Sequence, residues 1–385
     1  MTRSGADLES MLYLDHAATT PLRPDVRDAM APYIGERFGN PSGIHTTAQQ
    51  AKNAVEEARE QIAAAIGAPR PLEIVFTGGG TEADNLAVLG ASWPGDGAIV
   101  TTAVEHAAVL ESARFAERNG RAVTTLPVDR WGRVSPDDVA AAVDDGTAIV
   151  SVMMANNETG VCQPVDEITR RVREVGIRAF VHTDAVQAFA SLPVEVRDSG
   201  PDLISVSAHK IGGPQGVGFL FVRDGIELEP VIHGGGQELG RRSGTHNVAA
   251  IVGLGAAVVA SVADRDGYRT RVGAARDRFE HDLRSRTTIE VTAGDAQRLA
   301  SHSHLRFPGI AAETLLVRLD LAGVAAAAGA ACHSGAIETS HVLDAMGVDP
   351  VAASESIRFS FGRDDDASTG AAAAEIVAGV VEDLS

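Results

Sequence analysis

The clearest pattern of apolar and polar positions lies at residues 48–66, where small and aliphatic side chains recur every three or four residues. This spacing places them on one face of an α-helix. The pattern ends at Gly67, and glycine commonly terminates helices because it adopts a left-handed conformation without strain. We therefore predict an amphipathic helix that packs through the following side chains: Ala51, Ala54, Val55, Ala58, Ile62 and Ala65.

Beyond this helix, short apolar runs alternate with helical patterns, which include residues 107–118 and 165–175. Continuously apolar runs separated by helices are typical of strands in a parallel sheet, because helices then cover both of its faces. The chain is therefore predicted to be α/β with a mostly parallel central sheet. The expected strands lie at residues 74–76, 99–101, 122–126, 148–153, 180–182, 203–206 and 219–222.

The character of the chain changes near residues 264–267, where a charged helical pattern begins. A chain of 385 residues is longer than one hydrophobic core usually serves. We expect a large domain at residues 21–263 and a smaller α+β domain formed by residues 1–20 and 264–385. The longest apolar stretch, at residues 249–263, is shorter than the roughly 20 residues that a membrane-spanning helix needs, and it is interpreted as a buried helix.

Composition and charge exclude several classes of partner. Acidic residues outnumber basic ones by 52 to 33, and the net charge is −19. Nucleic acids and anionic membranes bind to basic surfaces, so neither is expected as a partner. Two cysteines and an N-terminus without an apolar signal segment indicate a cytoplasmic protein. No Cys/His spacing indicates a metal site, and His302 and His304 are interpreted as surface or strand residues.

Two segments carry candidate chemistry that has an equally simple structural explanation. Residues 76–82 read Phe-Thr-Gly-Gly-Gly-Thr-Glu, a strand end followed by a glycine turn and a helix start. Free N–H groups at a helix start suit a phosphate, although such turns are also common as purely structural features. Asp184 follows the strand at 180–182, where α/β proteins bind ligands, but its position also suits a helix N-cap.

A third segment, around Lys210, favours the functional interpretation of the other two. Lys210 follows the strand at 203–206, comes directly after His209 and precedes a glycine-rich turn, which is a poor place for mere packing. Pyridoxal phosphate requires a lysine for its Schiff base, a carboxylate for its pyridinium nitrogen and a cradle for its phosphate. Lys210, Asp184 and the glycine turn meet these requirements, so the sequence predicts a pyridoxal-phosphate enzyme.

The chain also resembles the NifS/IscS-like cysteine desulfurases, which are class-V aminotransferases with the fold-type I architecture of pyridoxal-phosphate transferases. The resemblance extends over nearly the whole chain, and its landmarks follow the family's order. They are residues 13–21 (YLDHAATTP), 39–42 (GNPS), 76–85, 104–106 (VEH), 155–160 (ANNETG), 182–187 (HTDAVQ), 207–213 (SAHKIGG), 234–237 (GGGQ), 242–245 (RSGT) and 356–360 (SIRFS).

Carried over residue by residue, the resemblance implies a cofactor site and a substrate site. Lys210 forms the Schiff base with pyridoxal phosphate, Asp184 pairs with the pyridinium nitrogen, and His106 stacks on the ring and moves protons. Arg358 binds the substrate carboxylate, which a planar guanidinium fork suits better than a lysine does. Asn157 and Gln187 contact the phenolic oxygen side of the ring, and Asn157 also binds the substrate. The residues assigned to the phosphate are Gly80, Thr81, Ser207, His209 and Thr245.

Thr245 is expected to come from the partner subunit, so the resemblance implies a homodimer with shared active sites. It also places the catalytic nucleophile at Cys332, in a segment of Gly and Ala that is followed by His333. Small neighbours suit a nucleophile that has to move, and a histidine can favour the reactive thiolate. Cys162 is interpreted instead as an inert core residue.

The implied reaction converts L-cysteine to L-alanine and passes the sulfur to Cys332 as a persulfide, and then to an acceptor protein. Residues 327–331 are Gly and Ala where many family members carry serines, and the string Gly-Ala-Ala-Cys-His-Ser at residues 329–334 also resembles selenocysteine lyases. L-selenocysteine is therefore an alternative substrate. The further alternatives are an aminotransferase of small amino acids and a non-enzymatic scaffold. The acceptor could serve iron–sulfur clusters, tRNA thiolation or a biosynthetic pathway.

Overall fold

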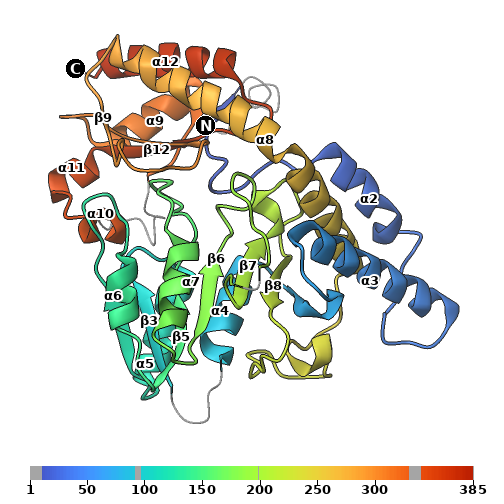
Figure 1. The fold of residues 1–385 in the computed structure, drawn as a ribbon. Helices are drawn as coiled ribbons and strands as arrows, with labels where there is room; N and C mark the ends of the chain where they lie inside the picture. Colours follow the sequence, from blue (N-terminus) through green and yellow to red (C-terminus); the bar gives the residue numbers. More distant parts are fainter. Residues whose placement is uncertain (1–10, 92–96, 198, 329–339, 385) are drawn as a thin grey trace.

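A seven-stranded sheet forms the centre of the protein, in the order β2-β8-β7-β6-β5-β3-β4 (Figure 1). The computed structural model describes residues 11–91, 97–197, 199–328 and 340–384. Each of the seven apolar runs singled out in the sequence forms one strand of this sheet. The strands are β2 (Ile74–Thr77), β3 (Ala98–Thr102), β4 (Val123–Leu126), β5 (Thr147–Ser151), β6 (Phe180–Asp184), β7 (Leu203–Ser207) and β8 (Gly218–Val222).

The sheet is parallel except at β8, which runs antiparallel to both of its neighbours, β2 and β7. The predicted α/β class with a mostly parallel sheet is therefore confirmed. Alternate side chains of each strand point to opposite faces, and helices cover both faces. On one face, α4 (Gly80–Gly90) and α5 (Ala107–Arg118) pack against a buried cluster that includes Ile99, Ile149 and Leu203.

The opposite face is covered by four helices. α3 and α8 pack against a buried cluster that includes Phe76, Val206 and Phe221, and α6 and α7 pack against one that includes Val150 and Val181. These helices are α3 (Thr46–Ile66), α6 (Pro136–Ala141), α7 (Val165–Glu174) and α8 (Val248–Arg284).

Helix α3 is the amphipathic helix expected at residues 48–66, and this prediction is confirmed. It begins two residues earlier, where the side chain of His45 caps it by accepting a hydrogen bond from the Ala48 amide. It ends at Gly67, whose φ of 71° is left-handed. Its expected apolar face is buried against the sheet, apart from the partly buried Ala65.

A smaller unit packs at one end of the large sheet (Figure 1). Its three-stranded antiparallel sheet has the order β12-β10-β9, and its core includes Leu14, Phe279, Phe359 and Phe361. A short parallel pair, β1 and β11, joins the N-terminal segment to this unit. Its elements are β1 (Leu12–Tyr13), β9 (Glu290–Val291), β10 (His302–Arg306), α9 (Ala312–Ala322), β11 (Val324–Ala325), β12 (Ser356–Ser360) and α12 (Ala367–Glu382). The remaining short elements are α2 (Pro24–Ile34), η1 (Pro71–Glu73), η2 (Ala208–Lys210), η3 (Glu238–Gly240), α10 (His341–Ala345) and α11 (Pro350–Ser354).

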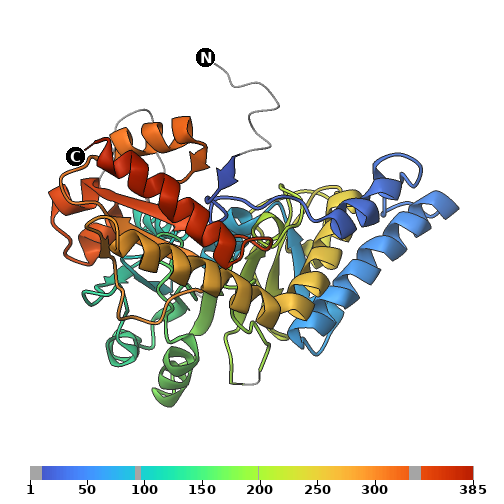
Figure 2. The ribbon, with the colours of Figure 1, turned by 90° about the horizontal axis from the view of Figure 1, so that it is seen from above.

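Helix α8 belongs to both cores, as its long path in Figure 2 illustrates. Leu254 and Val258 lie in the core beside α3, whereas Val272 and Phe279 lie in the core of the smaller unit. The buried helix expected at residues 249–263 is confirmed, because it forms the first half of α8. The predicted domain boundary at 263/264 falls inside this continuous helix and stays a prediction. Among the described helices, α8 alone is long and apolar enough to span a membrane by length and composition.

Candidate active site

The predicted cofactor residues meet at one edge of the large sheet. Asp184 is the last residue of β6 and Ser207 is the last residue of β7, and Lys210 follows directly in η2. His106 lies in the turn between β3 and α5. Carboxyl ends of neighbouring parallel strands lie side by side, and ligands of open α/β sheets bind there. The topology therefore brings together residues that are separated by up to about a hundred positions in the sequence.

A cleft of about 810 Å³ opens beside the glycine turn that precedes α4. Gly79 has a φ of +145°, which residues with side chains rarely adopt, and a Cβ at Gly80 would lie 2.8 Å from Cγ2 of Val186. Because Gly79 and Gly80 carry no side chain, a phosphate can approach the free N–H groups at the start of α4 closely. Four of the five predicted phosphate ligands line this cleft, namely Gly80, Thr81, Ser207 and His209.

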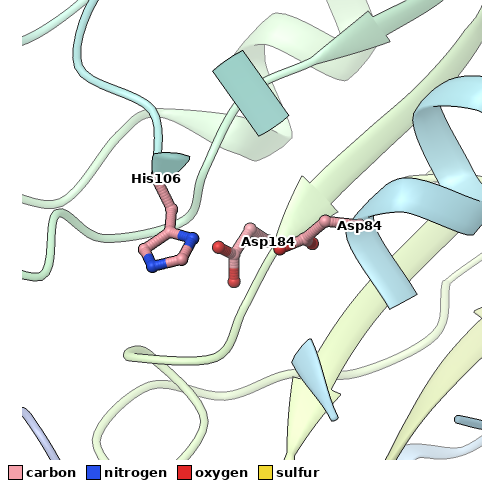
Figure 3. Close-up of side chains that lie close together, drawn as sticks. All are labelled: Asp84, His106 and Asp184. Atoms are coloured by element: carbon pink, nitrogen blue, oxygen red, sulfur yellow. The ribbon is translucent and has the colours of Figure 1, made fainter. Parts of the chain in front are cut away.

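Asp184 presents a buried carboxylate toward His106 (Figure 3). Its Oδ1 accepts a hydrogen bond of 2.8 Å from the Val186 amide, and the chain turns there without starting a helix, so the N-cap interpretation is wrong. Burial raises the pKa of Asp184, while the nearby His106 and Lys210 oppose this shift. A buried carboxyl group of this kind favours a positively charged partner.

His106 is held with one ring nitrogen facing its own helix. Its Nδ1 accepts a hydrogen bond of 3.1 Å from the Ala108 amide, which leaves the ring proton on Nε2. Burial lowers the pKa of His106, so the ring is neutral near neutral pH. A neutral imidazole with a free N–H can stack on an aromatic cofactor and can exchange a proton with a neighbour.

Lys210 has an environment that favours its neutral amine. Burial, with a further effect of the nearby Arg358, lowers the pKa of Lys210 to about 8, against the opposing effects of Asp184 and Asp15. Its Nζ donates a hydrogen bond to the Ala17 carbonyl, and Nε2 of Gln187 donates to the same oxygen at 2.6 Å. The neutral amine is the form that reacts with an aldehyde, so this lysine is suited to a Schiff base.

Arg358, in β12, brings the smaller unit to the same site. Its Nη2 donates to Oδ1 of Asp15 at 2.7 Å, and its Nη1 donates to the backbone carbonyl of Asn157 at 2.9 Å. The guanidinium is buried and close enough to Lys210 to lower the pKa of the lysine. A planar guanidinium with several donors, held near an amine, suits the carboxylate of an amino acid.

The predicted nucleophile, Cys332, lies outside the described residues, but the residues on either side of that segment meet at this site. The backbone of Ala327 pairs with that of Arg358 through hydrogen bonds of 3.2 and 2.8 Å. After the segment, Oγ of Ser340 donates to Glu158 at 2.5 Å, and Nε2 of His341 contacts the Glu105 carbonyl at 3.0 Å.

The second cysteine and two histidines lie in cores. Cys162 is buried beside Ala155 and Leu299, and burial raises the pKa of its thiol to about 11, so the predicted core role is confirmed. The placement of His302 and His304 in a strand is confirmed, but a surface position is wrong, since both are buried in β10. Their neighbours come from other elements, which the local sequence does not reveal.

Comparison with known proteins gives the same family as the sequence motifs. The family model for class-V aminotransferases matches residues 12–369. Cysteine desulfurase IscS of Dictyoglomus turgidum is 44% identical over 355 residues, which cover 91% of this chain and 89% of that protein. Putative cysteine desulfurase IscS 1 of Bacillus subtilis is 44% identical over 379 residues, which cover 97% and 99%. The solved structure of a NifS-like protein has a TM-score of 0.89 at 33% identity, covering 97% of this chain and 99% of that one.

The chain belongs to the cysteine desulfurases of the class-V aminotransferase family. The resemblance seen in the sequence is thereby confirmed, as is the fold-type I architecture.

This family depends on pyridoxal phosphate, and the residues of the cleft fit that cofactor. The glycine turn leaves backbone N–H groups open to a phosphate, and the buried carboxyl of Asp184 favours a cation such as a pyridinium. Polar atoms of Asp84, His106 and Asp184 lie within 4.8 Å of one another, a donor set that a positive charge suits. Lys210 supplies an amine with a lowered pKa next to this set.

Several residues at this desulfurase site were given no role there by the sequence. Asp15 pairs with Arg358, Glu158 binds Ser340, and Asp84 lies behind Asp184. All three belong to motifs that carry the family resemblance, at residues 13–21, 155–160 and 76–85. Their motifs were the available signal, but their partners depend on contacts between distant parts of the chain.

Proposed function

We propose that this desulfurase converts L-cysteine to L-alanine at the cleft described above, with pyridoxal phosphate held by Lys210 and Asp184 and with Cys332 as the sulfur acceptor. The observation that carries the proposal is the meeting of three groups. The amine of Lys210 lies close enough to both the carboxylate of Asp184 and the guanidinium of Arg358 for each of them to shift its pKa. We also infer that the protein works in a reducing compartment such as the cytoplasm, because its nucleophile has to stay a thiol.

Each of these residues has a distinct task in the reaction. Arg358 orients the amino acid by its carboxylate, with Asn157 and Asp15 fixing the guanidinium. Bound pyridoxal phosphate supplies an electron sink that stabilises negative charge at the substrate Cα. Asp184 would hold the ring nitrogen of the bound cofactor in its protonated form. Nζ of Lys210 can accept a proton, because its pKa is lowered to about 8.

The sulfur transfer is a two-electron step in which the enzyme thiolate is oxidised and the substrate carbon is reduced. The Cys332 thiolate attacks the substrate sulfur, so an S–S bond forms while the Cβ–S bond breaks. The electron pair of the broken bond stays with the substrate carbon, which takes up a proton and leaves as alanine. Cys332 is oxidised to a persulfide, and an acceptor thiolate can later remove the outer sulfur.

Product analysis separates this reaction from its alternatives. With L-cysteine as the sole substrate, the proposal predicts equal amounts of alanine and enzyme persulfide in one turnover. A keto acid without persulfide would instead indicate an aminotransferase. A comparison of turnover with L-cysteine and L-selenocysteine tests the selenocysteine lyase alternative, and a preparation that never holds the yellow cofactor would indicate a non-enzymatic scaffold.

Replacement of Arg358 by Lys is expected to raise KM for L-cysteine by about tenfold to a hundredfold, because a point charge replaces a two-donor fork. The kcat should fall less than the affinity. Steady-state kinetics and the cofactor spectrum measure both effects. Arg306 on β10, an arginine paired with Glu355 and Glu290 on the same small sheet, serves as the control, since Arg306→Lys should leave KM unchanged. An unchanged KM in the Arg358 variant would mean that the carboxylate binds elsewhere.

The active unit is proposed to be a homodimer in which each site borrows Thr245 from its partner. Thr245 is exposed and does not line the cleft of its own chain. Val231 and Ile232 line the cleft and are both 39% exposed, while Leu239 nearby in the sequence is 69% exposed. A partner subunit would cover such apolar side chains, and two-fold dimers are the commonest oligomers.

Mixing Thr245→Ala with Lys210→Ala protein is expected to restore activity, because each mixed dimer contains one site with neither change. The measurement is alanine formation after subunit exchange, which a mass label on one variant demonstrates. Wild type mixed with Lys210→Ala calibrates the activity of a dimer with one intact site. Continued inactivity despite demonstrated exchange would argue against a shared site.

A further inference from the structure

A second carboxyl group, that of Asp84, lies behind Asp184 and has no part in the reaction described above. Asp84 is in the second turn of α4 and is only 1% exposed. Its Oδ1 is buried without a hydrogen-bond partner among the described residues. Figure 3 shows its carboxyl next to that of Asp184, on the side away from His106, and polar atoms of the three residues lie within 4.8 Å of one another.

Among the described residues, no lysine or arginine forms an ion pair with Asp84. Nε2 of His182 lies 3.7 Å from Oδ1 of Asp84, but the ring of His182 is hydrogen-bonded to the hydroxyls of Ser205 and Ser151 at 2.9 and 2.8 Å. Burial lowers the pKa of His182 to about 3, so this ring is neutral and supplies no counter-charge. The hydroxyl of Ser205 opposes the effect of burial and lowers the pKa of Asp84, but it carries no charge.

The other ionisable groups near Asp84 either raise its pKa or favour the ionised form of Asp184 instead. Both Asp184 and Glu105 raise the pKa of Asp84, in addition to the larger effect of burial. By contrast, His106, Lys210 and the Val186 amide all favour the ionised form of Asp184. Two neighbouring carboxyl groups in a buried site do not both ionise, and the one with positive neighbours is the one that carries the charge.

We propose that Asp84 is a neutral carboxylic acid and a positioning residue for Asp184, so that the pair holds one proton, on Asp84, and one negative charge, on Asp184. This inference rests on the proposed function, since the single charge of the pair matches the single positive charge of a protonated cofactor ring. The polar, uncharged group of Asp84 then supports the buried anion without adding a second charge.

Infrared difference spectroscopy of the holoenzyme tests the protonation directly. The spectrum of wild type minus that of Asp84→Asn near pH 7.5 should contain the carbonyl stretch of a protonated carboxyl group. Glu105→Gln is the matched control, because Glu105 is another buried carboxyl whose pKa burial raises to about 8. The Asp84 band should persist in the Glu105→Gln background. A difference spectrum that shows only an ionised carboxylate at Asp84 would overturn the proposal.

Cofactor affinity tests the positioning role. Asp84→Asn keeps a neutral polar group of the same shape and should hold pyridoxal phosphate within about threefold of wild type. Asp84→Ala removes the polar neighbour of a buried charge and should bind it about tenfold more weakly or worse. Asp184→Asn removes the charge itself and should lose more affinity than either. Wild-type affinity in Asp84→Ala, or a loss in Asp84→Asn as large as that in Asp184→Asn, would contradict the proposal.

These outcomes are distinguishable from failure of the proposed function. If wild type does not bind pyridoxal phosphate, the cofactor assignment is wrong whatever the state of Asp84. If wild type binds it and the Asp84 variants behave otherwise than expected, only the one-proton pair is wrong. Should the Ala variant fail to fold, the infrared spectrum and the affinity of Asp84→Asn still decide the question.

Discussion

Lys210→Ala protein is expected to fold, to lack covalently attached cofactor, and to desulfurate L-cysteine about 10³-fold more slowly than wild type or worse, as is typical when a covalent catalytic group is removed. Lys210 is the amine that burial keeps reactive, with its pKa lowered to about 8 and its Nζ directed to the Ala17 carbonyl. The cofactor absorbance and the rate of alanine formation measure the two effects.

The composition of the chain makes the assignment of Lys210 unusually easy to test. The sequence contains two lysines, Lys52 and Lys210, and Lys52 is exposed on α3. Borohydride reduction of wild type should therefore fix the cofactor to the peptide of Lys210. Lys52→Ala is the matched control and should retain the cofactor and full activity. Cofactor attached to Lys52, or to the N-terminal amine, would contradict the assignment.

Cys332→Ala is expected to keep the cofactor and its spectral change with L-cysteine, but to lose persulfide formation and alanine release, by about 10³-fold or more. The reason is that the thiolate of Cys332 breaks the Cβ–S bond, whereas binding and the cofactor chemistry depend on other residues. With selenocysteine the variant can retain activity, because the weaker carbon–selenium bond can break without a thiol. Turnover of both substrates, followed by alanine formation, measures the difference.

Cys162→Ala is the control for the nucleophile. Burial raises the pKa of Cys162 to about 11, so almost none of it is thiolate at neutral pH, and it packs beside Ala155 and Leu299. The variant should keep turnover close to that of wild type and lose roughly 1 kcal/mol of unfolding free energy from altered packing. Full cysteine turnover by Cys332→Ala, together with inactivity of Cys162→Ala, would reverse the assignment.

The fold was predictable because its elements leave local signals. The strands of the large sheet are short runs buried on both faces, except the edge strand β4, which exposes Thr124 and Thr125. Helix α3 shows a helical apolar stripe that ends at Gly67. The domain boundary was harder to predict from the sequence. Helix α8 keeps one helical pattern, although its first half packs with α3 and its second half packs in the core around Phe279. Local patterns report what an element buries, but not against which neighbour.

The candidate site divides in the same way. The strand-end positions of Asp184 and Ser207 and the glycine turn before α4 follow from the order of elements, so sequence alone brings them to one edge of the sheet. The pairing of Arg358 with Asp15 joins residues from opposite ends of the chain, and the burial of His302 and His304 depends on the packing of the smaller unit. Such contacts depend on tertiary packing, which no periodicity encodes.

Mapping the persulfide of wild-type enzyme tests the central claim most directly. The enzyme is given L-cysteine for one turnover without an acceptor, its thiols are blocked, and its peptides are weighed. The account predicts one additional sulfur atom on the peptide of Cys332, in the same amount as the alanine released, and none on the peptide of Cys162. Additional sulfur on Cys162, or stoichiometric alanine with no persulfide on Cys332, would contradict it.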